Sequence, residues 1–180
     1  IVPFALLFFS VFSFKKNLAV KFFIAAVALG TLLAIDTPLQ AVIGKLQIPV
    51  LSTSNPTRII VLESFALSVL AGFGFENLID FIQKRKRKNL LIGFIPTLVV
   101  IFIVWICILF LKLPSADTFL IAKRNMILPT ILFSVFIFTA FLGMYVSSKK
   151  IILKCAIFVI LLLVSYDSLR FAQKWMPFDP

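Results

Sequence analysis

The chain has 180 residues, of which 62% are hydrophobic and only 14% charged, and 22 are phenylalanine. This composition excludes an ordinary soluble globular domain and indicates an integral membrane protein. The formal net charge of +11 would suggest nucleic-acid binding in a soluble protein, but the soluble domain that such binding requires is missing, so we expect no nucleic-acid partner.

Apolar runs that can cross a bilayer recur along the chain. A helix needs about 20 residues to span the hydrocarbon layer, and open sheets cannot leave backbone groups unpaired in lipid. We therefore predict an all-α, polytopic bundle of about six transmembrane helices. The predicted spans are residues 1–14, which form a truncated first helix, and residues 17–35, 58–82, 90–111, 126–146 and 150–166.

The first apolar run starts at Ile1 without a preceding basic segment, and no small-residue cleavage site follows it. A truncated helix fits this pattern better than a signal peptide. The last residues, "MPFDP", have the composition of an extended segment. We expect residues 1–180 to be a single transmembrane helical region from a longer protein, with residues 167–180 starting an extracytoplasmic segment.

Basic residues predict the orientation of the spans. If Lys15, Lys16 and Lys21 lie inside, alternation places "QKRKRKN" and "SSKKIILK" inside too, and most of the 18 basic residues then flank short inner turns. A run of five cations would serve as a topology anchor beside anionic lipid headgroups. These residues are Lys84, Arg85, Lys86, Arg87 and Lys88.

Three segments are then expected on the outer side: residues 36–57, 112–125 and the tail from Asp167. The first, "DTPLQAVIGKLQIPVLSTSNPT", is long and partly apolar, which is typical of an interfacial or re-entrant loop. Non-helical backbone at membrane depth needs a polar cavity or protein cover. We therefore expect a pocket on the outer side.

A helix start with an adjacent arginine predicts an anion site next to this loop. Asn55 is a favourable N-cap residue and Pro56 suits the first helical position. Arg58 then lies in the first turn. Free N–H groups at a helix start, together with a guanidinium, suit a phosphate or carboxylate. Asn55 and Arg58 are therefore the candidate lipid-phosphate site.

Glu63 follows Arg58 by five residues, about 7.5 Å along the helix. An ionised side chain deep in a membrane helix costs about 2.5 to 3.5 kcal/mol, so Glu63 needs a partner, water or a proton. Two interpretations stay open. Glu63 is either a cavity residue near a bound head group, or an interfacial carboxylate paired with a neighbouring helix or with solvent.

Other side chains in the spans predict packing. Ser64, Ser68 and Gly72 recur every fourth residue, as in closely packed membrane helices. Cys107 and Cys155 lie in apolar runs, so we expect buried, unpaired thiols. The sequence contains no His, and we predict no metal site.

Pro96 and Pro129 fall within the first turns of the predicted spans, where proline starts or bends a helix at limited cost. Neither position demands a functional role.

Two stretches carry a family resemblance. The run "TPLQAVIGKLQIPVLSTSNPTRIIVLESFALSVLAGFGFENLI" resembles the part of the bacterial YfhO-like membrane proteins in which an Arg-x-Pro-x-Arg element leads into a helix. Pro56 and Arg58 match the second half of that element, whereas Ser54 stands in place of its first Arg. The run "YDSLRFAQKWMPFDP" resembles the family's Asp-bearing exit from a late helix into an extracytoplasmic segment.

This family is similar to multi-pass GT-C glycosyltransferases. The resemblance implies transfer of a sugar from a polyprenyl-phosphate donor to a cell-envelope polymer or glycan, at the outer face of the bacterial cytoplasmic membrane. The partners would be the bilayer, the lipid-linked sugar and the envelope glycan. The catalytic carboxylates are expected upstream of Ile1, so the catalytic residues stay unknown and Glu63 would act at most in support. The need for a divalent metal is left open.

Two other functions fit the same spans. A lipid-linked sugar transporter or flippase would need polar residues through the bundle, and the last three predicted helices are too apolar to supply them. A noncatalytic membrane scaffold for envelope assembly would need no cavity.

Overall fold

The computed structural model describes residues 1–34, 59–110, 116–145 and 150–175. All regular elements in these ranges are helical, which confirms the all-α prediction for the described part of the chain. The elements are α1 (Val2–Ser10), the 3-10 helix η1 (Val11–Ser13), α2 (Leu18–Ala34), α4 (Ile59–Gln83), α5 (Arg87–Phe110), α6 (Ala116–Tyr145) and α7 (Lys150–Trp175).

Three of these helices are long and apolar enough to cross a membrane. The spanning segments are Val61–Gln83 of α4, Arg87–Phe110 of α5 and Thr118–Tyr145 of α6. Two shorter apolar helices cover Val2–Ser13 and Leu18–Leu33. The chain is therefore a helical membrane protein with several candidate spans, and the six-span arrangement stays a prediction.

Helices α5, α6 and α7 are longer than the spans predicted for them. α5 begins at Arg87 rather than at residue 90, and α6 begins at Ala116, so most of the predicted outer loop 112–125 is helical. α7 continues to Trp175, beyond the predicted end at residue 166. Hydropathy detects only the lipid-compatible part of a helix, whereas Lys and Arg are good helix formers that extend it into the interface.

Because α5 and α6 start early, Pro96 and Pro129 lie inside these helices and not in their first turns, as the sequence had suggested. A proline inside a helix lacks the N–H that would bond the carbonyl four residues earlier. In α5 that carbonyl belongs to Ile92.

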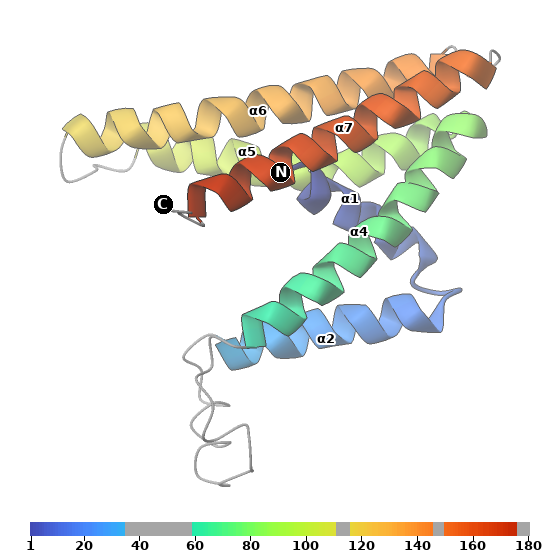
Figure 1. Ribbon diagram of the computed structural model, residues 1–180, viewed down its shortest axis with the longest axis horizontal. Helices are drawn as coiled ribbons and strands as arrows, with labels where there is room; N and C mark the ends of the chain where they lie inside the picture. Colours follow the sequence, from blue (N-terminus) through green and yellow to red (C-terminus); the bar gives the residue numbers. More distant parts are fainter. Residues whose placement is uncertain (35–58, 111–115, 146–149, 176–180) are drawn as a thin grey trace, which may run out of the picture.

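The helices form two parts that share α4 (Figure 1). α5, α6 and α7 lie together in the upper part of the view, and the short α1 lies between them and α4. α4 runs obliquely from this group to α2 at the bottom. We call the group of α1, α5, α6, α7 and the C-terminal half of α4 the bundle. α2 and the N-terminal half of α4 form the arm.

Phenylalanine rings fill the core of the bundle. Phe94 of α5 packs edge-to-face on Phe9 of α1, with ring centroids 5.1 Å apart, and on Phe136 of α6 at 5.3 Å. All three rings are buried. Such edge-to-face pairs are favourable beyond the area they bury, and they join three helices at one point.

Glycines let α1 approach its neighbours closely. A methyl group added to Gly74 of α4 would overlap the backbone carbonyl of Leu6, and one added to Gly93 of α5 would overlap the ring of Phe9. The contact at Gly74 therefore brings the backbones of two helices together, as small residues do in membrane proteins.

The small-residue stripe lies elsewhere on α4. Ser64, Ser68 and Gly72 are exposed, and a methyl group added to Gly72 would meet no atom within 4 Å. Within the described residues the close helix contact of α4 is thus at Gly74, and the packing role of the stripe stays a prediction.

The prediction that Cys107 and Cys155 are buried is wrong, because both thiols are free and exposed. α5 and α7 carry apolar residues around their circumference, for example Phe102 and Phe158, which are also exposed. In lipid such side chains need no protein cover, so an apolar run does not reveal which face of a helix is packed.

Candidate functional site

Glu63 contacts α2 in the seam of the arm. Its carboxyl Oε1 lies 2.7 Å from the hydroxyl Oγ1 of Thr31, within hydrogen-bond distance. Gly30, next to Thr31, faces the Glu63 side chain, so that a methyl group there would lie 3.4 Å from the Glu63 Cβ. Glu63 therefore has a polar partner on a neighbouring helix and packs opposite Gly30.

The hydrogen bonds around Thr31 accommodate two protonation states of Glu63. The Thr31 hydroxyl has one proton and lies near two acceptors, the Val27 carbonyl at 2.9 Å and Glu63 Oε1 at 2.7 Å. If Glu63 is a carboxylate, Thr31 can donate to it. If Glu63 is a carboxylic acid, it donates to Thr31 and Thr31 donates to Val27. The same side-chain positions thus serve a charged and a neutral carboxyl group.

The predicted anion site cannot be placed, because Asn55 and Arg58 lie outside the described residues. The described part of α4 begins at Ile59, directly after Arg58. Of Asn55, Arg58 and Glu63, only Glu63 lies within the described residues.

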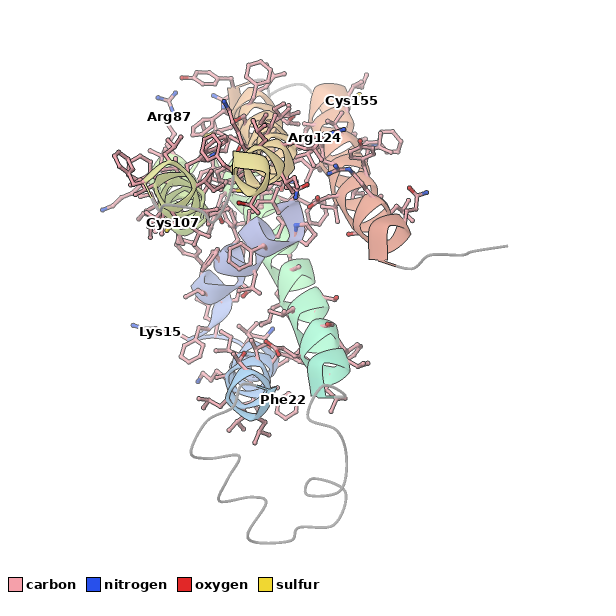
Figure 2. All side chains as sticks on the ribbon, turned by 90° about the vertical axis from the view of Figure 1, so that its left-hand side faces the viewer. Lys15, Phe22, Arg87, Cys107, Arg124 and Cys155 are labelled. Atoms are coloured by element: carbon pink, nitrogen blue, oxygen red, sulfur yellow. The ribbon has the colours of Figure 1, made fainter. Side chains whose placement is uncertain are left out.

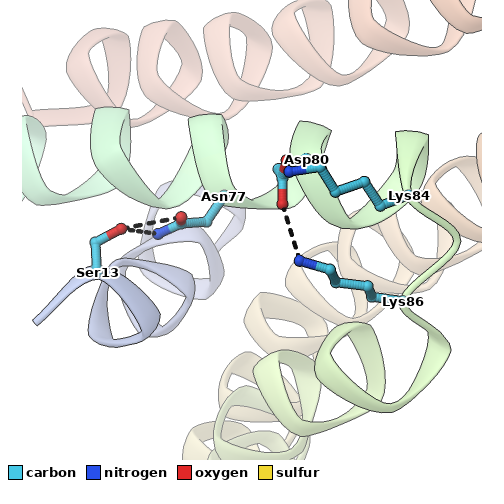
Figure 3. A network of polar contacts seen from close by, with 5 residues as sticks. All are labelled: Ser13, Asn77, Asp80, Lys84 and Lys86. Atoms are coloured by element: carbon cyan, nitrogen blue, oxygen red, sulfur yellow. Dashed lines mark hydrogen bonds and ion pairs between the residues drawn. The ribbon is translucent and has the colours of Figure 1, made fainter. Parts of the chain in front are cut away.

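A second polar cluster binds the C-terminal end of α1 to α4, and the sequence analysis did not find it. The side-chain amide of Asn77 donates to the Phe9 carbonyl at 2.9 Å. It also exchanges hydrogen bonds with the Ser13 hydroxyl, at 2.8 and 3.0 Å (Figure 3). Carbonyls at a helix end need such partners where no water reaches them.

The N-terminal end of α1 meets α7. The carboxylate of Asp167 accepts a hydrogen bond from the Val2 backbone N–H at 3.1 Å. A hollow of about 330 Å³ beside this contact is lined by Ile1, Pro3, Phe4, Asp167 and Ser168. Both ends of α1 are therefore bonded by side chains of other helices.

The basic run forms an ordered turn between α4 and α5. Arg85 has a positive φ of 52°. The N–H of Lys86 donates to the Phe81 carbonyl at 2.9 Å and that of Arg85 to the Ile82 carbonyl at 3.3 Å. These two bonds define a Schellman motif, which usually has glycine at the position of Arg85.

Side-chain contacts support the same turn. Asp80 forms ion pairs with Lys84 and, at 3.3 Å, with Lys86 (Figure 3). The guanidinium of Arg87 lies 5.1 Å from the centre of the Tyr145 ring at the end of α6. The turn and the α1–α2 connection lie at the same end of the molecule (Figure 1). This placement agrees with basic turns that share one membrane face, while the face itself stays a prediction.

No group of three or more His, Cys, Asp or Glu side chains suited to a metal ion occurs among the described residues. A scan against models of known protein families found no match for the chain, and searches of curated proteins and of solved structures also found none. The YfhO-like resemblance therefore rests on the sequence motifs alone.

Proposed function

We propose that this chain is the membrane-embedded region of a GT-C-like transferase that uses a polyprenyl-phosphate sugar donor to modify a cell-envelope glycan. The observation that carries the proposal is the Glu63 carboxyl group held by Thr31 in the arm. It lies near the start of the described part of α4, five residues after Arg58, the candidate phosphate ligand.

The position of this contact supports the proposal. The described start of α4 and the end of α2 lie together at the end of the molecule opposite the basic turns (Figure 1). If the basic turns face the cytoplasm, as the charge rule expects, Glu63 lies toward the outer side, where the donor would be used. The donor phosphate would bind at Asn55 and Arg58, and Glu63 would orient the head group. A carboxylate outside this chain would activate the acceptor hydroxyl.

The test is a transfer assay on the full-length protein with a polyprenyl-phosphate sugar. We expect Arg58→Ala to raise the KM for the donor about tenfold or more, because a hydrogen bond to a charged group is lost. Lys123→Ala is the matched control, since Lys123 is an exposed cation of α6 that is not expected to contact the donor. Unchanged donor kinetics in Arg58→Ala protein that is correctly inserted would contradict the proposal.

A noncatalytic scaffold is the second candidate, and the apolar character of one hollow favours it. The hollow between α1 and α4 is lined by Pro3, Phe4, Leu7, Leu67 and Ser68, which offer no acid or base. A scaffold predicts that Arg58→Ala and Glu63→Gln change the amount of assembled protein at constant turnover. Measuring both quantities for each variant distinguishes the two functions.

A further inference from the structure

An apolar groove of about 370 Å³ lies between α5 and the segment formed by α1 and η1. Its lining residues are Phe8, Val11, Phe12, Ile92 and Pro96. Val11 and Ile92 are 54% and 43% exposed, so the groove is open to the surroundings along its side. The volume falls in the range of about 300 to 1,000 Å³ that is usual for small-molecule sites.

One cation, Lys88, lies about one helical turn before the groove on α5. Lys88, Ile92 and Pro96 follow each other at intervals of four residues and therefore share one face of the helix. Lys88 is about 6 Å from Ile92 along the axis, from the rise of four helical residues. It is exposed and forms no ion pair with an acidic residue in the described ranges.

A second cation, Lys86, lies over an aromatic ring that packs on a residue of the groove wall. The ammonium group of Lys86 lies 5.7 Å from the centre of the Phe81 ring. That ring packs edge-to-face on Phe12 at 5.0 Å, and Phe12 lines the groove. In Figure 2, Lys15, just after η1, and Arg87, at the start of α5, both lie on the left of the view, with Arg87 well above Lys15. The apolar groove therefore has a cationic end.

We propose that this groove binds one anionic phospholipid, with an acyl chain along the apolar walls and the phosphate at Lys88 and Lys86. The charge supports an anionic occupant, because this turn contains five basic residues, 84 to 88, whereas one carboxylate, that of Asp80, pairs with Lys84 and Lys86. The apolar walls explain why the occupant is a lipid rather than a free phosphate. The inference does not depend on the transferase proposal, because it concerns the opposite end of the molecule.

Binding is measured on the full-length protein in detergent by native mass spectrometry, with titration of dioleoyl-phosphatidylglycerol and, separately, dioleoyl-phosphatidylcholine. We expect the wild-type protein to retain the anionic lipid preferentially. Lys88→Gln should weaken this binding about fivefold, the effect of one cation near an anionic lipid surface. Ile92→Trp should reduce it as well by filling the groove.

Two matched controls use exposed positions away from the groove. Lys123→Gln removes a cation from α6, and Ile103→Trp adds the same ring to α5 at a side chain that is 52% exposed. Both should bind phosphatidylglycerol as the wild type does. Val11→Trp fills the groove from its other wall and replaces Ile92→Trp if that variant does not fold.

Three results would overturn the proposal. Equal weakening by Lys88→Gln and Lys123→Gln would mean that general surface charge attracts the lipid. Full binding in both folded tryptophan variants of the groove would exclude the groove as the site of the acyl chain. Displacement of the lipid by inorganic phosphate at comparable concentration would show that the site recognises a free phosphate.

Discussion

The two halves of α4 are held by their neighbours in different ways. In the bundle, Gly74 brings the backbone of α4 against that of α1, and Asn77 bonds the end of α1. In the arm, α4 meets α2 through the Glu63–Thr31 contact and through the rings of Phe65 and Phe23, 6.2 Å apart. In the bundle, α4 is therefore held by close backbone packing in addition to side-chain contacts, whereas the contacts given for the arm are between side chains.

This difference shows where the molecule can change shape at low energetic cost. A polar contact between membrane helices is worth about 0.6 kcal/mol on average and at most about 2. Much of the arm surface is open, since Val61 and Leu62 are each 70% exposed. We therefore expect the arm to adjust its shape more readily than the bundle.

Among the stability predictions, the largest change in unfolding free energy is expected from Gly74→Ala, which tests the close contact between α1 and α4. The added methyl group would overlap the Leu6 carbonyl, and overpacking against backbone should lower the free energy of unfolding by about 3 kcal/mol or more. Unfolding by SDS in mixed micelles measures this change. Gly72→Ala is the control, which should be neutral or stabilising by up to about 1 kcal/mol. Equal stability of the two variants would contradict the α1–α4 contact.

Asn77→Leu should have the next largest effect. It leaves the Phe9 carbonyl without its side-chain donor, which should cost about 2 kcal/mol of unfolding free energy. Ser13→Ala removes only the hydroxyl group and keeps the Asn77–Phe9 bond, so its cost should be below about 1 kcal/mol. The same SDS titration compares the pair, and a Ser13→Ala effect as large as that of Asn77→Leu would refute the role assigned to the carbonyl.

Thr31→Val tests the contact between α2 and α4 in the arm. It should lower the free energy of unfolding by only about 1 kcal/mol, because one polar contact between membrane helices is lost. Thr31→Ser keeps the hydroxyl group and should unfold close to the wild type. If Thr31→Val destabilises the protein as much as Asn77→Leu does, the contrast between arm and bundle does not hold.

The smallest change in unfolding free energy, a stabilisation, is expected for a substitution in the turn between α4 and α5. Arg85→Gly relieves a positive φ that costs an L-residue about 1 to 2 kcal/mol, while the greater freedom of glycine in the unfolded chain offsets part of the gain. The net stabilisation should be about 0.5 kcal/mol. Arg87→Gly, at the first residue of α5, should instead destabilise by about 1 kcal/mol, because its cation–π contact with Tyr145 is lost and glycine is a weak helix former. A loss of stability in both variants would argue against the Schellman geometry.

The helices could be predicted from the sequence, but their packed faces could not. The described part of α4, Ile59–Gln83, nearly matches the predicted residues 58–82, because a run of apolar residues is sufficient to identify a helix in lipid. The helices are apolar around their circumference, so hydropathy does not distinguish protein-facing from lipid-facing positions. Cys107 was assigned to the wrong face for this reason.

The polar contacts were partly foreseeable. Glu63 was identified because a carboxyl group in an apolar run requires a partner, but nothing in the sequence pointed to Thr31 on another helix. Asn77 carries a comparable signal, a polar amide within a span. Its partner Phe9 is 68 positions away, and a backbone carbonyl leaves no trace in the residue type. Contacts of this kind depend on how the helices cross.

The tight turn at Arg85 has a consequence for how the protein enters the membrane during synthesis. α5 is the most apolar of the three candidate spans and α4 the least, since α4 carries Glu63, Glu76 and Asp80. Because the connection is so short, we expect α4 and α5 to enter the lipid as one hairpin, in which the more apolar α5 supports the less apolar α4.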